Sequence, residues 1–290
     1  MKKQLSQELK EHKTPKIRIN AVLLLVLTGI ALAGTMYYLQ FMQKPEAQTF
    51  MQRAAQQESL GQIEEALLSY DRVINAFPQG KEAPEALLRT ARIWHHDRSD
   101  PQQALVNYLL LERDYPDSPQ QQVAQENAAR IVKYDLRDDA AAIGYYQRLL
   151  DKHPQQGDRY QYEIADSYLR LENYPQARIE LEQLLNLFPE SELTADALHR
   201  KAMILMIENR PDEAKQVWQD LIDLFPQGSY SSQARFNLAR LHEEQGELEE
   251  ALEGYRQLEN FPRPGLLQQK IRHLEQRSAV RNEVTENDAE

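Results

Sequence analysis

The side chains best suited to chemistry in this chain are its seven histidines and its many carboxylates. The densest group is Trp94-His95-His96-Asp97, in which two imidazoles and a carboxylate are ligand types that bind metals. Adjacent residues of a helix point in different directions around its axis, so we expect this run to be the exposed end of a helix that enters a turn. No H-E-x-x-H zinc pattern and no glycine-rich phosphate loop occurs in the sequence.

Other kinds of catalytic centre are also disfavoured. The chain has no cysteine, which excludes disulfides, thiolate metal sites and cysteine nucleophiles. With 45 aspartates and glutamates, close carboxylate pairs are inevitable, and none can be singled out for acid–base catalysis. We therefore predict that the protein is not an enzyme and holds no metal or cofactor. A hydrolase activity that one substitution abolishes would support the enzymatic alternative.

The elements that position these residues are marked by a repeat. Six times, at a spacing of 35 to 38 residues, an aromatic residue or histidine is followed by proline: Phe77-Pro78, Tyr115-Pro116, His153-Pro154, Phe188-Pro189, Phe225-Pro226 and Phe261-Pro262. A fixed period in this range is typical of a repeat array. Because proline lacks an amide donor and restricts the residue before it, each pair is expected to end a helix.

Each proline is preceded, 11 or 12 residues earlier, by an alanine, and four residues after that alanine comes a large side chain. The alanines are Ala66, Ala104, Ala142, Ala177, Ala214 and Ala251, and the large residues are Tyr70, Tyr108, Tyr146, Leu181, Trp218 and Tyr255. A small residue lets two helices approach closely, and a residue four positions on fills the adjoining space. In repeats two and three the first-helix alanines, Ala91 and Ala129, lie one residue further from Ala104 and Ala142 than in the other repeats.

This pattern resembles the tetratricopeptide repeat family over roughly residues 47 to 262. The resemblance implies an all-α fold, a right-handed α-solenoid of about six helix–turn–helix repeats with a capping helix. The repeat ends read F/Y-P-x-S/G, as in Phe188-Pro189-Glu190-Ser191, and this variant is similar to bacterial envelope proteins of the BamD and CpoB kind. BamD is a lipoprotein, and the absence of cysteine here departs from that pattern.

The N-terminus predicts a membrane anchor. No charged residue occurs between Ile19 and Met42, and the 19 residues from Ala21 to Leu39 would span about 30 Å of hydrocarbon as a helix. Basic residues precede this run, so the positive-inside rule places the N-terminus in the cytoplasm and the repeats across the inner membrane, an arrangement similar to that of YfgM. The alternative is a signal peptide cleaved after Ala33, because Ala31-Leu32-Ala33 before Gly34 fits the small-x-small pattern.

Charge narrows the choice of partner. Residues 1–20 carry six lysines and arginines and two glutamates, so the remainder has 28 basic and 43 acidic residues, a net charge of about −15. An acidic domain repels phosphate backbones, so we predict no nucleic-acid partner.

The family resemblance also implies where a partner binds, since the first helix of each repeat lines the concave groove in that family. On the matching positions, the predicted partner-binding residues are Arg92, Arg130, Lys133, Tyr134, Arg159, Tyr162, Arg170, His199 and Arg240, with His95, His96, Glu126, Asp166 and Met203 beside them. Their excess of cations favours a protein or peptide segment that is acidic. The alternative is that these cations pair with carboxylates of adjacent helices. The lysine–asparagine pair of the family's carboxylate-binding members does not occur here.

Together these features predict a membrane-anchored repeat protein that acts as a scaffold or chaperone-like adaptor in the bacterial cell envelope; the alternative is a cleaved, soluble periplasmic factor that works with cell-wall or outer-membrane machinery. The predicted boundaries are a cytoplasmic basic leader at 1–18, a transmembrane helix at 19–42, a linker at 43–46, six repeats at 47–264, a capping helix at 265–276 and a disordered tail at 277–290.

Overall fold

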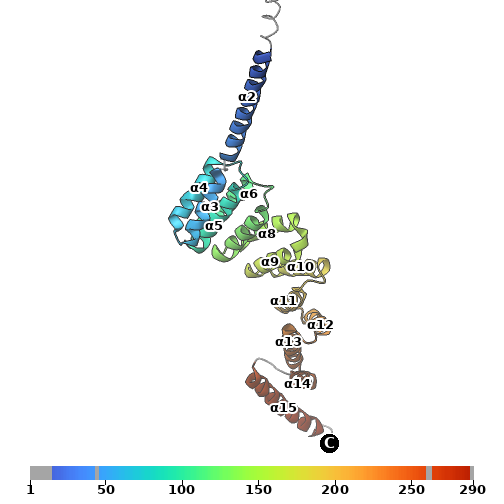
Figure 1. Ribbon diagram of the computed structural model, residues 1–290. Coiled ribbons are helices and arrows are strands. Elements are labelled where there is room, and N and C mark those ends of the chain that lie inside the picture. Colours follow the sequence, from blue (N-terminus) through green and yellow to red (C-terminus); the bar gives the residue numbers. More distant parts are fainter. Residues whose placement is uncertain (1–14, 43–45, 259–262, 288–290) are drawn as a thin grey trace, which may run out of the picture. The chain divides into compact units, whose positions relative to one another are not determined.

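The computed structural model describes residues 15–42, 46–258 and 263–287, and within these ranges the chain is helical with short turns and no strand (Figure 1). The predicted leader up to residue 14, most of the linker and the Phe261-Pro262 pair lie outside the described residues. The chain divides into two compact units, residues 1–100 and 101–290.

The repeats are pairs of helices, as the proline spacing predicts. In the first unit α2 (Pro15–Met42) is followed by α3 (Glu46–Ser59), α4 (Ile63–Ala76) and α5 (Ala83–His96). In the second unit the order is α6 (Pro101–Asp114), α7 (Gln121–Arg130), η1 (Ile131–Asp135), α8 (Asp139–Lys152), η2 (Pro154–Gln156), α9 (Gly157–Arg170), α10 (Tyr174–Leu187), α11 (Thr194–Ile207), α12 (Pro211–Leu224), α13 (Ser229–Gln245), α14 (Leu248–Arg256) and α15 (Pro264–Asn287).

The alanines lie at the helix contacts. All six second-helix alanines have no exposed surface, and the large residue four positions after each is at most 4% exposed. Each hydrophobic cluster joins the two helices of one repeat to the first helix of the next; one contains Ala202, Ala214 and Trp218 together with Ala234 of α13. A helix pair therefore buries its apolar face only with the help of its neighbour, as expected of a repeat array.

The buried tyrosines need partners for their hydroxyl groups. Tyr70 donates a hydrogen bond to Glu58 Oε2 at 2.6 Å, and Tyr255 donates to Glu243 Oε2 at 3.1 Å. Glu58 and Glu243 each lie four residues after the first-helix alanine of their repeats, Ala54 and Ala239. A buried hydroxyl without a partner is costly, so each of these glutamates completes the packing of its repeat.

The aromatic-proline pairs end the second helices in one shared way. Phe77, His153, Phe188 and Phe225 have φ near −130°, and each still donates its amide to the carbonyl four residues earlier. The amide of the residue three positions after the aromatic residue then donates a hydrogen bond to the carbonyl of that aromatic residue, as Ser191 does to Phe188 at 3.0 Å. The serine or glycine of the motif thus closes the turn into the next repeat.

Each turn within a repeat contains one residue in the left-handed region. These are Gly61, Ser99, Arg137, Glu172, Asn209 and Gly246, with φ between 51° and 80°. Each lies five residues before the second-helix alanine. A left-handed residue just past a helix is a common C-terminal cap, and glycine adopts it without the Cβ penalty.

The extra residue in repeats two and three is taken up at the end of the first helix. In repeat three, η1 is a π-helical segment, in which the helix widens to hold one more residue per turn. Asp138 therefore donates its amide to Val132, six residues back, whereas Asn173 in repeat four donates to Tyr168, five back. Repeat two closes in the same wider way, from Asp100 to Trp94.

At both ends of the chain the structure differs from the boundaries and elements that the sequence predicts. α15 runs from Pro264 to Asn287, so it is longer than the cap expected at 265–276 and includes most of the tail expected to be disordered at 277–290. Leu267 and Leu274 of α15 are buried in the cluster of repeat six, which is the role expected of a cap. Within the described residues, no helix has the length and hydropathy of a membrane span, so the anchor expected at 19–42 is not supported.

The left-handed turns generate a stability prediction. Glu172 is exposed and has φ of 58°, so Glu172→Gly removes a Cβ penalty and should raise the free energy of unfolding by about 0.5–1 kcal/mol. Glu172→Ala keeps the Cβ and is the matched control, which should change little. Thermal denaturation followed by circular dichroism checks this, and equal melting temperatures for the two variants would contradict it.

Candidate functional site

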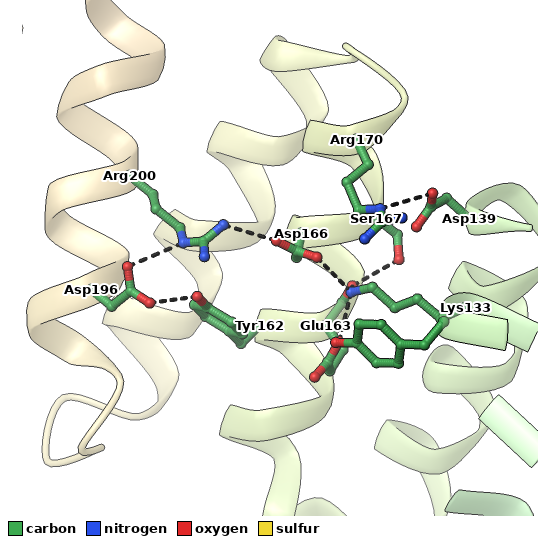
Figure 2. A network of polar contacts seen from close by, with 10 residues as sticks. Lys133, Asp139, Tyr162, Glu163, Asp166, Ser167, Arg170, Asp196 and Arg200 are labelled. Carbon is green, nitrogen blue, oxygen red and sulfur yellow. Dashed lines mark hydrogen bonds and ion pairs between the residues drawn. The ribbon is translucent and has the colours of Figure 1, made fainter. Parts of the chain in front are cut away.

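A polar network connects the first helices of repeats three, four and five, and Lys133 lies at its centre (Figure 2). The Lys133 side chain, which belongs to the π-helical segment η1, has no exposed surface. Its Nζ lies 2.6 Å from Glu163 Oε2 and 2.8 Å from Asp166 Oδ2, and it donates a third hydrogen bond to the Glu163 carbonyl at 2.9 Å. The three donors of a buried ammonium are thus all satisfied, two of them by carboxylates.

The network continues to α11 through Arg200. This guanidinium lies 2.8 Å from Asp166 Oδ1 and 3.1 Å from Asp196 Oδ1, and its Cζ lies 5.0 Å from the centre of the Tyr162 ring. The Tyr162 hydroxyl donates to Asp196 Oδ2, which closes a ring of contacts between α9 and α11. Asp166 therefore joins Lys133 to Arg200 (Figure 2).

The other end of the network holds α8 against α9. Arg170 Nε, in the last turn of α9, lies 3.0 Å from Asp139 Oδ2 in the first turn of α8. Ser167 donates a hydrogen bond to the Glu163 carbonyl at 2.9 Å, so this oxygen receives both the hydroxyl and Lys133 Nζ. The Tyr134 hydroxyl donates to Glu163 Oε2 at 2.7 Å, although nearly half of Tyr134 remains exposed.

The charges of the network are closely balanced. Lys133, Arg170 and Arg200 face four carboxylates, those of Asp139, Glu163, Asp166 and Asp196. Burial alone raises the pKa of Asp166, but the hydrogen bond and charge of Lys133, together with Arg200, outweigh it and hold the pKa below the usual value. The stability that this adds is present above the usual aspartate pKa and is lost as the pH falls through the lowered value.

Some of the predicted partner-binding residues are held by contacts within the protein, and others are not. Those held by contacts are Lys133, Tyr134, Tyr162 and Arg170 in the network, Arg240, which lies 3.4 Å from Glu244, and His199, whose ring centre lies 5.4 Å from that of Tyr230. The cations of this set pair with carboxylates of the protein itself, as the alternative interpretation of the sequence expects. Arg130 and Arg159 are exposed and have no ion pair among the described residues, while half-buried Arg92 belongs to the other compact unit.

An exposed apolar strip accompanies these residues on α11. Met203 and Ile207, one helical turn apart, are 37% and 55% exposed. His199, one turn before Met203, is half-buried, and burial lowers the pKa of its imidazole. A neutral histidine, a methionine and an isoleucine thus follow each other along one line of the helix.

The histidine cluster of repeat two differs in part from its prediction. His96 is exposed and is the last residue of α5, as expected. The expectation that the adjacent rings point apart is wrong, since the ring centres of His95 and His96 lie 4.5 Å from each other. Over the part of the chain that the structure describes, no three acidic or histidine side chains are grouped to hold a metal ion.

Sequence reasoning missed half of the network. Asp139, Glu163, Asp196 and Arg200 were not singled out, although the repeat period contains a usable signal. Tyr162 and Asp196 are 34 residues apart, as are Asp166 and Arg200, whereas the first-helix alanines Ala165 and Ala202 are 37 apart, so each partner on α11 lies one turn before the equivalent position. Lys133 was placed on the surface, although it lies four residues after Ala129, at the position from which Glu58 and Glu243 contact buried tyrosines in other repeats.

Comparison with known families identifies the repeats. Two family models, both described as tetratricopeptide repeat, match this sequence. One matches residues 33–80, and the other matches 131–192, 162–229 and 199–263 in overlapping copies, so together they cover more than half of the chain. The chain belongs to the tetratricopeptide repeat family. The finer resemblance to BamD, CpoB and YfgM is not confirmed by these matches.

The matches leave residues 81–130 uncovered. Residues 81–130 contain repeat two and α7, the first helix of repeat three. In both of these tetratricopeptide repeats the first-helix alanine lies one residue further from the second than in the other four. The extra residue changes the register of the repeat without changing its helix pair.

The solved structures that this chain resembles are distant in sequence. A Naa15/Naa10 complex bound to HypK-THB has 17% identity and a TM-score of 0.59, covering 86% of this chain and 38% of that one. A tetratricopeptide repeat protein from Parabacteroides merdae has 15% identity and a TM-score of 0.49, with 79% and 98% covered. PilW, described as a type IV pilus biogenesis factor, has 16% identity and a TM-score of 0.45, with 76% and 95% covered. These likenesses concern the fold alone, and the search of curated proteins found no match.

The network generates a second stability prediction. Lys133→Met keeps the aliphatic stem but leaves Glu163 and Asp166 without their shared cation, so it should lower the free energy of unfolding by about 3 kcal/mol. Arg130→Met removes an exposed cation one turn away and should cost no more than about 0.5 kcal/mol. Urea denaturation of both variants measures the difference.

A compensating variant tests the cause. If the loss comes from uncompensated carboxylates, adding Glu163→Gln to Lys133→Met should recover part of it, because the neutral amide needs no cation. Equal stability of Lys133→Met and Arg130→Met, or no recovery in the double variant, would contradict this account of the network.

Proposed function

We propose that this chain is a non-catalytic scaffold that holds protein or peptide segments on the face formed by its first helices, in the bacterial cell envelope. The proposal rests on four side chains that take no part in the polar network and are exposed on first helices of residues 101–290. They are Arg130, Arg159, Met203 and Ile207. Tetratricopeptide repeats are in general non-catalytic scaffolds for other proteins, which agrees with this reading.

The segment that suits this face is acidic and has an apolar anchor. Arg130 and Arg159 offer guanidinium groups that are not consumed by carboxylates of the described residues. A guanidinium binds a carboxylate with two parallel hydrogen bonds, which fixes orientation as well as adding affinity. Met203 and Ile207 offer apolar surface, and methionine adapts its shape to different side chains. Lys133 is left out of this proposed site because it is buried.

We also propose that the protein is tethered in the inner membrane through residues 19–42, with its N-terminus cytoplasmic and its repeats periplasmic. The sequence supports this through an uncharged run of 24 residues that basic residues precede. In the described part of α2, Leu24, Leu25, Leu27, Ile30 and Leu32 are between 57% and 71% exposed. A continuous exposed apolar surface of this kind needs a nonpolar environment.

Charge reversal tests the docking face. Arg130→Glu combined with Arg159→Glu should lower the yield of partners crosslinked from a photoreactive residue at Met203 by tenfold or more, because each lost charged contact contributes roughly 1.5–3 kcal/mol. The matched control is Arg72→Glu with Arg148→Glu, which reverses two exposed arginines on second helices that have no ion pair among the described residues. Partner capture that is unchanged in the first variant, or equally reduced in the control, would contradict the proposal.

A separate measurement tests the tether. The protein made in bacteria should remain with the membranes after alkaline carbonate extraction and should retain the mass of the uncleaved chain, because the apolar run stays in the bilayer. A mature chain that begins at Gly34 and leaves the membrane would establish the cleaved periplasmic alternative. The control is Ala33→Leu, which blocks cleavage at that site and should leave the behaviour of an uncleaved protein unchanged.

A further inference from the structure

A cavity opens between α12, α13 and α14 in repeats five and six, away from the polar network. Its volume is about 550 Å³. Ile222 of α12 and Leu238 and Ala239 of α13 supply its apolar surface, while α14 contributes mainly polar residues and one glycine. A cavity of this size accommodates a large side chain of a partner together with some flanking backbone.

The wall of the cavity includes a glycine at which α13 and α14 approach each other closely. Gly254 lies three residues after the second-helix alanine of repeat six, and the same position in the other repeats holds Ser69, Asn107, Tyr145, Glu180 and Val217. Val217, for example, is only 8% exposed and belongs to a hydrophobic cluster. In repeat six this position has no room for a side chain, because a Cβ at Gly254 would lie only 3.0 Å from the Ala239 Cβ. The sixth repeat thus lacks a side chain at a position where three of the others bury one.

The rim of the cavity is acidic. Glu249, Glu250 and Glu253 line it and are exposed, and none of the three has an ion pair among the described residues. Arg235 also lines the cavity, but its Nη2 donates to the Pro226 carbonyl at 2.9 Å. His242 lines it as well and is in contact with Glu247 through Nδ1. Three carboxylates against one guanidinium leave the cavity negatively charged.

We propose that this cavity is a second binding site, which takes an arginine side chain of a partner protein. The aliphatic stem of arginine packs on Ile222, Leu238 and Ala239, and its guanidinium lies between Glu250 and Glu253. These two glutamates are one turn apart on α14, so a planar group with several donors can meet both. This site is of opposite charge to the first-helix face and does not depend on the function proposed for that face.

A titration followed by methyl NMR tests this site on the full chain in detergent micelles. The probe is N-acetyl-arginine amide, which should cause saturable shifts of the Ile222 and Leu238 methyl signals. N-acetyl-citrulline amide has nearly the same shape without the charge and should bind at least roughly tenfold more weakly, because a charge-assisted contact is lost. N-acetyl-lysine amide should also bind more weakly, since a point-like ammonium cannot form the two parallel hydrogen bonds that a planar guanidinium forms with a carboxylate.

Two matched variants complete the test. Glu250→Gln with Glu253→Gln should weaken binding of the arginine probe by roughly tenfold or more. Glu190→Gln with Glu192→Gln changes net charge equally at exposed positions outside the cavity, so it should leave the affinity unchanged. Absent or non-saturable shifts, equal affinity for citrulline or lysine amide, or equal loss in the two variants would each overturn the proposal. None of these results bears on the crosslinking test at Met203.

Discussion

The close contact of two helices at a pair of alanines is the constraint on which the rest of the structure depends. Ala202 and Ala214, for example, are fully buried, and the bulk they lack is supplied by Trp218 one turn further along. A larger residue at either position would separate the helices and lose contacts throughout a tightly packed cluster. Because the first helix of the next repeat completes the same cluster, this local requirement also sets how successive repeats stack.

This constraint also fixes a position on each first helix that faces the interior of its repeat. Glu58, Lys133 and Glu243 all lie four residues after a first-helix alanine, and in repeats one and six the glutamate there receives a tyrosine hydroxyl. Repeat three has a lysine at this position, near the ring of Tyr146 at 5.8 Å. The alanine contact is fixed, so the extra residue widens the helix end instead, and the lysine turns toward two carboxylates of α9. Lys133, which the sequence pattern predicts to lie on the surface, is therefore a buried cation in the structure.

Much of the fold follows from the sequence, since one small residue and one proline per repeat define each second helix. The left-handed residues in the turns were harder to predict from the sequence. Glycine favours this conformation at Gly61 and Gly246, but Arg137 and Glu172 adopt it under tertiary constraint. The site was the least predictable part. Sequence offsets place residues on the first helices, but whether a cation there is free depends on its neighbours 34 residues away, as for Asp166 and Arg200.

The same period that brings partners together also limits where other molecules can bind. Turns of successive first helices face each other with an offset of one turn, and opposite charges at facing turns neutralise one another, as Asp166 does with Arg200. Both binding sites that we propose lie where a repeat departs from the common pattern. Met203 and Ile207 place apolar side chains where repeat four has Asp166 and Arg170, and Gly254 brings α13 and α14 into close contact at the position that Val217 occupies in the repeat before it. In these proposed sites, specificity comes from departures from the repeat more than from the repeat itself.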